Sequence, residues 1–280
     1  MLALLASLTL VAAPAPGLRA KQDPSVGTAA APRAASVAPA SAPAPIIVVG
    51  FVGGYVRRDN DVHSVVQVAA RLSKSYPSGV QVMVFENHNR QDAQRAILRL
   101  LAGAGPADAP GSSHPTPDPT PEQKRDARII IFGHSWGASE TVTLARKLAA
   151  DGIPVLLTIQ VDSVRKHGED DGVIPANVAE AANFFQLDGF LHGRSEIRAE
   201  DPERTHILGN YQFRYRERHI TCDSPYPWYN RVFMHAHTEI ECDPDVWDKV
   251  EALIRAKLPP AEPGTSSAQA ATEKTEARQP

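Results

Sequence analysis

The chain has 280 residues, of which 42% are hydrophobic and 22% charged, and its formal net charge is −3. This length suffices for one large domain or two small ones. The balanced charge gives no basic patch of the size that nucleic-acid binding requires, so we expect no nucleic-acid partner.

The 24 prolines are concentrated in three stretches rather than spread along the chain. Such Pro-, Ala-, Ser- and Thr-rich tracts bury too little apolar surface to offset the entropy of an ordered chain. We therefore predict one domain flanked by disorder. Its predicted parts are a disordered leader at residues 1–44, a domain at 45–258 with a flexible Pro-rich loop at about 105–122, and a disordered tail at 259–280.

The first residues, "MLALLASLTLVAAPAPG", are apolar for about a dozen positions and then turn to small residues and proline. This pattern resembles the hydrophobic region and cleavage zone of a secretory signal peptide, although the positively charged start is missing. The alternative is an unstructured Ala-rich leader. The apolar run is short for a transmembrane helix, so we expect an exported protein without stable membrane insertion.

The sequence between the Pro-rich tracts alternates apolar strands with amphipathic helices. We predict strands at residues 45–50, 80–86, 128–132, 154–163 and 205–214. We predict helices at residues 64–75 (with Ser64 as cap), 90–103, 138–152, 174–186 and 244–258. Strands that are apolar on both faces and alternate with helices indicate an α/β fold, with a mostly parallel sheet covered by helices on both faces. In such sheets the reactive groups lie beyond the carboxyl ends of the strands.

A serine between two glycines follows the third predicted strand, in Gly133-His134-Ser135-Trp136-Gly137. A strand that turns at once into a helix needs a sharp corner, and small residues on either side let the backbone pass. The corner side chain then projects into open space, which is the geometry of the G-x-S-x-G nucleophile elbow. The alternative is a Gly/Ser turn that only caps a helix.

A serine hydroxyl needs a base to become a nucleophile, and the base needs an acid that orients it. With this elbow, the acid and then the histidine are expected later in the chain. Our choice for the base is His237, in a predicted loop before the last helix, with Asp243 and Pro244 starting that helix. His235 is the alternative, although we expect it to pack beneath the loop.

Asp162 is the predicted acid because it ends the strand that follows the nucleophile strand. Its carboxylate should therefore lie on the same rim of the sheet as Ser135. A turn-capping aspartate is the alternative interpretation, and Asp188, Asp201 and Glu217 are rival acids.

Two backbone amides are predicted to form an oxyanion hole. One belongs to Trp136, at the start of the helix after the serine, where N–H groups are free and the helix dipole is positive. The other is predicted at Phe51, in the glycine-rich loop "GFVGGY" after the first strand. Gly53 and Gly54 in that loop are alternatively plain turn residues.

With the elbow, the glycine loop, Asp162 and His237 in this order, the chain resembles compact lipase- and esterase-like α/β-hydrolases. The resemblance covers about residues 45–258 in topology and four short stretches in motif. It implies a reduced α/β-hydrolase fold. It also implies an enzyme that cleaves an ester or related acyl bond through an acyl-serine, with no metal or organic cofactor. Two departures stand out: many members have His-Gly where Val49-Gly50 stands here, and most place the acid one strand later than Asp162.

The resemblance leads us to expect a small-molecule acyl ester as substrate and a monomeric protein. Two rival hypotheses are a catalytically inactive α/β-hydrolase-fold binding module and an acyltransferase that uses the same triad. The complete Ser, Asp and His order argues against the inactive module. Cys222 and Cys242 either form a disulfide, if the protein is exported, or are two ordinary thiols.

Overall fold

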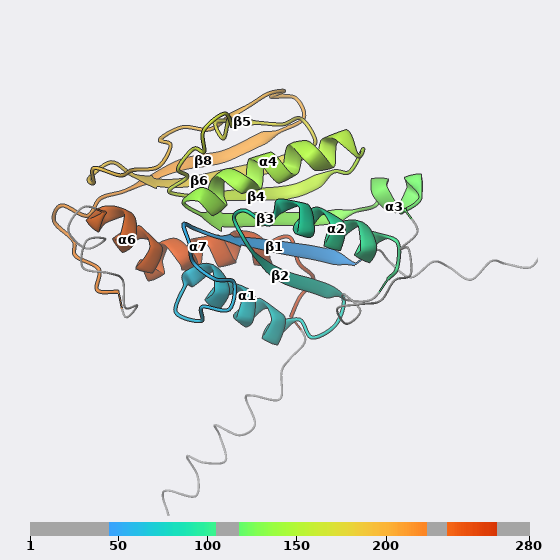
Figure 1. Cartoon of the computed structure of the whole chain (residues 1–280), viewed down its shortest axis with the longest axis horizontal. Coiled ribbons are helices and arrows are strands. Elements are labelled where there is room, and N and C mark those ends of the chain that lie inside the picture. The colour runs from blue at the N-terminus through green and yellow to red at the C-terminus, as the bar shows by residue number, and fades with distance from the viewer. Residues whose placement is uncertain (1–44, 105–117, 223–233, 262–280) are drawn as a thin grey trace, which may run out of the picture. The chain divides into compact units, whose positions relative to one another are not determined.

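Six parallel strands form one central sheet in the computed structural model, which describes residues 45–104, 118–222 and 234–261 (Figure 1). The order across the sheet is β2-β1-β3-β4-β6-β8. The strands are β1 (Ile46–Val52), β2 (Val80–Glu86), β3 (Arg128–His134), β4 (Val155–Val161), β6 (Val178–Gln186) and β8 (His206–Phe213). Two short strands, β5 (Val173–Ile174) and β7 (Arg198–Ala199), pair with each other. The predicted α/β fold with a parallel sheet is confirmed.

Helices cover both faces of this sheet. Successive side chains of the central strands point to opposite faces, and both sets are apolar, so each face needs a covering layer. In β1, Val48 and Val52 belong to one buried cluster, whereas Ile47 and Val49 belong to the other. The first cluster includes side chains of α1 (Ser64–Ser75), α6 (His235–Cys242) and α7 (Pro244–Arg255). The second includes side chains of α2 (Arg90–Leu101) and α4 (Trp136–Ala150). A one-turn helix, α3 (Pro121–Arg125), precedes β3.

The strand order reverses between β1 and β3, since β2 lies on the other side of β1. The connection through α1 runs on one face and the connection through α4 on the other. At such a switch point the two connecting loops diverge and leave a crevice at the carboxyl ends of the strands. The loop after β1 and the turn after β3 meet there, and the predicted nucleophile lies in that turn.

The helix predicted at residues 174–186 is wrong. Residues 178–186 form strand β6, which pairs with β4 on one side and β8 on the other. Its side chains from Ala181 to Gln186 are all buried. Tertiary pairing at the centre of a sheet overrides the helical propensity of the Ala- and Glu-containing segment.

Smaller corrections concern the ends of helices. Ser64 is the first residue of α1 and not its cap, since His63 occupies the cap position. The Ser64 hydroxyl instead donates to the carbonyl of Glu241, 2.6 Å away, and thereby ties α1 to α6. The helix α3 lies partly inside the predicted Pro-rich loop and is held by a capping box between Thr120 and Gln123.

The predicted signal sequence, most of the Pro-rich loop, and the tail beyond residue 261 lie outside the described residues. Every helix and strand of the described ranges falls within the predicted domain at 45–258. Among the helices described, none combines the length and apolarity needed to cross a bilayer.

Candidate active site

Ser135 occupies the corner between β3 and α4 with φ 57° and ψ −124°. This backbone conformation is strained for a residue with a side chain. The two flanking glycines explain how the chain tolerates it. A Cβ on Gly133 would lie 2.9 Å from the amide nitrogen of Ala138, and one on Gly137 would lie 2.7 Å from the carbonyl oxygen of Val52. Ser135 therefore lies at a sharp strand-to-helix corner between two closely packed glycines, which is the backbone geometry expected at the predicted elbow.

His237 lies within hydrogen-bond distance of the serine. Its Nε2 is 2.9 Å from Oγ of Ser135, and both side chains are buried. The predicted loop location is wrong, because residues 235–242 form α6 and His237 is in its first turn. A helix, and not a loop, therefore holds the imidazole beside Ser135. The predicted start of α7 is confirmed, with Asp243 as N-cap and Pro244 as first residue.

Asp162 follows β4 and completes a chain of contacts through Ser135, His237 and Asp162, which we call the triad. Its Oδ2 lies 2.6 Å from Nδ1 of His237, on the ring side opposite the serine. The carboxylate is fully buried and also accepts hydrogen bonds from the backbone N–H of Gly193, at 2.7 Å, and from the side chain of Gln186, at 2.9 Å. A buried carboxylate with this many donors is held in one orientation.

Backbone strain recurs at Asp162, which has φ 45°. Among the described non-glycine residues, Ser135 and Asp162 are the ones with positive φ. Gly193 is required beside Asp162, since a Cβ there would lie 2.5 Å from its Oδ1. Strained residues held by their surroundings are typical of functional sites.

The rival acids are engaged elsewhere or exposed. Asp188 accepts from the backbone N–H of Tyr215 at 2.6 Å and pairs with Arg216 at 3.0 Å. Asp201 accepts from the backbone of Glu203, two residues along. Glu217 is exposed. The expectation that His235 packs beneath the loop is wrong, because it is half-exposed at the start of α6 and faces Glu239.

His134, the residue before the serine, stacks on the triad histidine. The ring centroids of His134 and His237 are 4.8 Å apart with an interplanar angle of 28°. Behind it, the ring of His63 lies 5.7 Å away. Burial lowers the pKa of His134 well below its usual value, and the neighbouring His237 and His63 lower it further. An uncharged ring therefore lines one face of the triad histidine.

The two predicted oxyanion donors stay predictions. Trp136 is the first residue of α4, so its N–H has no acceptor one turn back within the helix. Phe51 is buried in β1, in register with Phe85 and Gly133. The loop beyond β1 comes against the serine at Gly53, where a Cβ would lie 2.9 Å from Cβ of Ser135. Residues just past the end of β1 thus approach the nucleophile as well.

Exposed aromatic residues stand on the same rim of the sheet. Tyr55, in the loop after β1, is 93% exposed and makes an edge-on contact with Trp136. Phe190, in the loop after β6, is 96% exposed. Gly189 beside it approaches Ala236 of α6.

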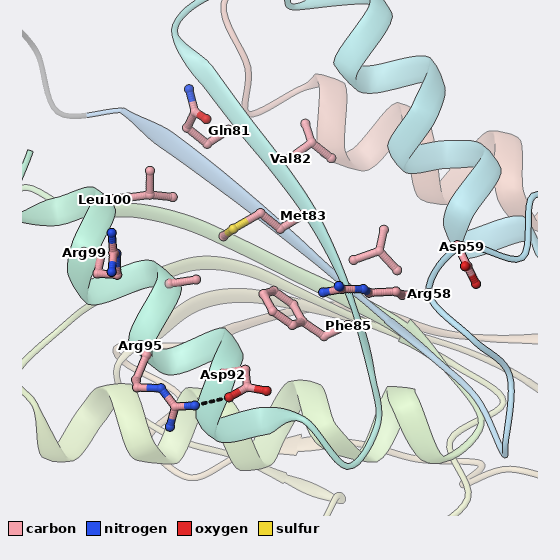
Figure 2. A pocket seen from close by; sticks show the side chains of 12 residues that line it. Arg58, Asp59, Gln81, Val82, Met83, Phe85, Asp92, Arg95, Arg99 and Leu100 are labelled. Atoms are coloured by element: carbon pink, nitrogen blue, oxygen red, sulfur yellow. Dashed lines mark hydrogen bonds and ion pairs between the residues drawn. The ribbon is translucent and has the colours of Figure 1, made fainter. Parts of the chain in front are cut away.

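A separate surface pocket of about 730 Å³ lies between the edge strand β2 and α2 (Figure 2). It is lined by apolar side chains such as Met83 and Phe85 and by charged ones such as Arg58 and Arg95, the latter paired with Asp92. No triad residue lines it. This pocket therefore does not belong to the candidate active site.

Cys222 and Cys242 form a disulfide, which the sequence analysis left open. The bond joins the end of α6 to the segment that follows β8. The disulfide therefore restrains the position of α6, the helix that contains His237.

Two contributors to the site were missed from the sequence. Gln186 and Gly193 both donate to Asp162. Gln186 is the last residue of β6, and Asp162 follows the neighbouring strand β4. Had β6 been predicted as a strand, the position of Gln186 at its end would have placed this residue near Asp162. The close approach of Gly193 has no signal in the sequence.

Comparisons with known proteins add no relative. No family model matches the chain, and no curated protein matches it.

Proposed function

We propose that this protein is a serine hydrolase that cleaves a carboxylic ester, or a related acyl bond, through an acyl-serine intermediate. The observation that carries the proposal is the pair of contacts made by His237, with Ser135 Oγ at 2.9 Å and Asp162 Oδ2 at 2.6 Å. These are the distances that proton transfer from a nucleophilic serine to a base, oriented by a carboxylate, requires.

In the proposed reaction, Ser135 Oγ attacks the carbonyl carbon of the substrate while Nε2 of His237 takes its proton. Asp162 holds the ring through Nδ1 and stabilises the imidazolium that forms. Negative charge develops on the substrate oxygen, where the amide of Trp136 and an amide near the end of β1 would stabilise it. His237 then protonates the leaving alcohol, and the acyl-serine remains. In the second half of the reaction, His237 takes a proton from a water molecule that attacks the acyl carbon, and then returns it to Ser135 as the acid is released. This chemistry uses no cofactor.

The exposed rim supports a small-molecule substrate with an apolar acyl group. Tyr55 and Phe190 project from loops at the carboxyl ends of β1 and β6, on the edge of the sheet where Ser135 lies. Aromatic side chains at the mouth of a site supply apolar contact area for an acyl chain. We propose esters of small to moderate length.

The disulfide supports the proposal that the protein is exported, because disulfides persist in oxidising compartments. The Ala-rich, apolar start of the sequence agrees with this.

The proposal is tested with p-nitrophenyl esters of increasing acyl length. Ser135→Ala should lower kcat/KM by at least about 1,000-fold, since it removes the nucleophile. Ser139→Ala, one turn along the same helix and also buried, is the matched control and should keep activity. Asp162→Asn should strongly lower kcat/KM, whereas Asp188→Asn should keep it close to the wild-type value. Turnover retained by folded Ser135→Ala would contradict the proposal.

A further inference from the structure

A second group of polar side chains lies on the outer side of α6, apart from the triad. It consists of His219, in the segment after β8, together with His235 and Glu239 of α6. One potential ligand atom from each residue lies within 4.8 Å of those from the other two. His235 and Glu239 are four residues apart on the helix, so they share one face.

The two separations between a histidine and the glutamate in this group are close to those between ligands of one metal ion. Nδ1 of His235 is 3.0 Å from Oε2 of Glu239, and Nδ1 of His219 is 3.5 Å from Oε1. Two ligands at about 2.0–2.1 Å from a tetrahedral zinc ion stand roughly 3.3 Å apart. Both imidazoles thus lie near the carboxylate at the spacing of zinc ligands, and the three ligand atoms lie within 4.8 Å of one another.

Glu239 is the anchor of the group. Its side chain is only 4% exposed, and its Oε2 accepts no hydrogen bond even though His235 is near. A buried carboxylate oxygen without a donor is costly, and a cation would satisfy it. The other oxygen, Oε1, accepts the backbone N–H of Ile220 at 3.0 Å. Such a hydrogen bond orients a metal ligand from behind.

The nearby arginines do not oppose a cation at this position, because carboxylates neutralise them. Arg216 pairs with Asp188 at 3.0 Å. Arg218 pairs with Asp243 at 3.0 Å and with Asp245 at 2.8 Å. The Glu239 carboxylate then supplies the negative formal charge of the group. The two histidines would bind the ion through neutral ring nitrogens.

We propose that His219, His235 and Glu239 bind one divalent transition-metal ion, with Zn²⁺ as the preferred ion. Two imidazole nitrogens and one carboxylate oxygen form a donor set that suits zinc. The histidine side chains are 73% and 51% exposed, so the ion enters from solvent and keeps a fourth position for water. The site is separate from the proposed hydrolytic chemistry and does not depend on it.

Binding at this site would stabilise α6. The ion joins the segment that contains His219 to the first turns of the helix, and the Cys222–Cys242 disulfide joins the same two regions at the far end of α6. Because an ion that binds only the folded state raises its stability, the melting temperature should rise with Zn²⁺ concentration.

The test uses the untagged full-length protein, stripped with a chelator and titrated with ZnCl₂ by calorimetry. We expect one ion per chain and a rise in melting temperature. His219→Ala, His235→Ala and Glu239→Gln should each weaken binding by at least about 100-fold. His88→Ala, at an exposed histidine outside the group, is the matched control and should bind like the wild type.

Two further measurements exclude unfolding of a variant and zinc binding by the triad histidine as explanations. Because Glu239 is buried, its variant is checked for folding by circular dichroism; the exposed His219 variant tests the site even if the Glu239 variant unfolds. His237→Ala should retain zinc binding, which separates this site from the triad histidine. The proposal is overturned if the wild type binds no more tightly than His219→Ala and His235→Ala. It is equally overturned if the stoichiometric ion is lost in His237→Ala instead.

Discussion

At the scale of single residues, the strain of the backbone is concentrated where the proposed chemistry occurs. Ser135 and Asp162 both adopt positive φ, and both contact His237. Each such residue costs about 1–3 kcal/mol and persists only when its surroundings hold it. The amide of Ser135 donates to the carbonyl of Val161 at 2.9 Å, and the amide of Asp162 donates to that of Phe184 at 2.7 Å. The neighbouring strands thus hold both corners.

Gly137→Ala tests whether close packing explains the second elbow glycine. Helix propensity alone predicts a gain of about 1 kcal/mol, since Gly137 lies in α4. The carbonyls of Phe51 and Val52 leave no room for a Cβ, so we expect a net loss of about 2 kcal/mol or more in the free energy of unfolding. Urea denaturation measures it. Gly54→Ala, where a Cβ meets open space, should cost about 1 kcal/mol. A stabilised Gly137→Ala protein would refute the packing explanation.

The sequence predicts the three triad residues because each has a positional signal. Ser135 is marked by its glycines and by the apolar strand before it, and Asp162 by the end of the next strand. His237 follows from chain order. The stacking of His134 on His237 was not predictable, because ring contacts between β3 and α6 depend on how these elements pack, and no local pattern records that.

At the scale of elements, β6 is the strand of the central sheet that was not predicted from the sequence, and it bears directly on the site. Its last residue, Gln186, lies beside the corner at Asp162. The side-chain nitrogen donates both to Oδ2 of Asp162 and to the carbonyl of Leu191, each at 2.9 Å. Its oxygen accepts from the backbone N–H of Asp188 at 2.8 Å. Gln186 therefore links the carboxylate to the loop that follows β6.

Gln186→Leu should leave the fold intact and impair the orientation of Asp162. Loss of one hydrogen bond to a buried charge costs about 1.5–3 kcal/mol, so we expect kcat for an activated ester to fall by about 10- to 100-fold with little change in KM. Gln212→Leu, at an exposed position of the neighbouring strand β8, is the control. Equal activity of the two variants would show that Gln186 does not position the acid.

α6 illustrates a second limit of sequence patterns. Its eight residues, His235–Cys242, include polar and charged side chains that are nevertheless buried, among them His237, Glu239 and Glu241. A short helix without an apolar stripe cannot be distinguished from a loop by periodicity. The disulfide and the bond from Ser64 to the carbonyl of Glu241 hold the helix in place, and both are long-range contacts.

At the scale of the whole molecule, three neighbouring histidine rings connect elements that are far apart in sequence. His63 precedes α1, His134 ends β3 and His237 lies in the first turn of α6. Burial lowers the pKa of His63, although the nearby Glu241 carboxylate opposes that shift. The pKa of His134 is lowered as well, chiefly by burial. In the folded protein both rings stay neutral at pH values where exposed histidines are protonated.

This arrangement predicts a loss of stability in mild acid. Below about pH 6.5 the unfolded chain binds protons at His63 and His134 that the folded chain does not bind, so the free energy of unfolding falls as pH falls. Each such histidine contributes a slope of up to about 1.4 kcal/mol per pH unit. His134→Phe should reduce the slope between pH 6.5 and 5, measured by urea denaturation, whereas His88→Phe at an exposed position should not. An unchanged slope in His134→Phe would show that His134 is protonated in the folded state.

The most direct test of the proposed hydrolase is covalent labelling with a fluorophosphonate, followed by mass spectrometry of the digested protein. A serine that His237 activates displaces fluoride and forms a stable phosphonyl ester. We predict a single modification on the peptide that contains Ser135, abolished in His237→Ala although Ser135 is still present. An unmodified wild-type protein, or a label carried by a different serine, would contradict the account.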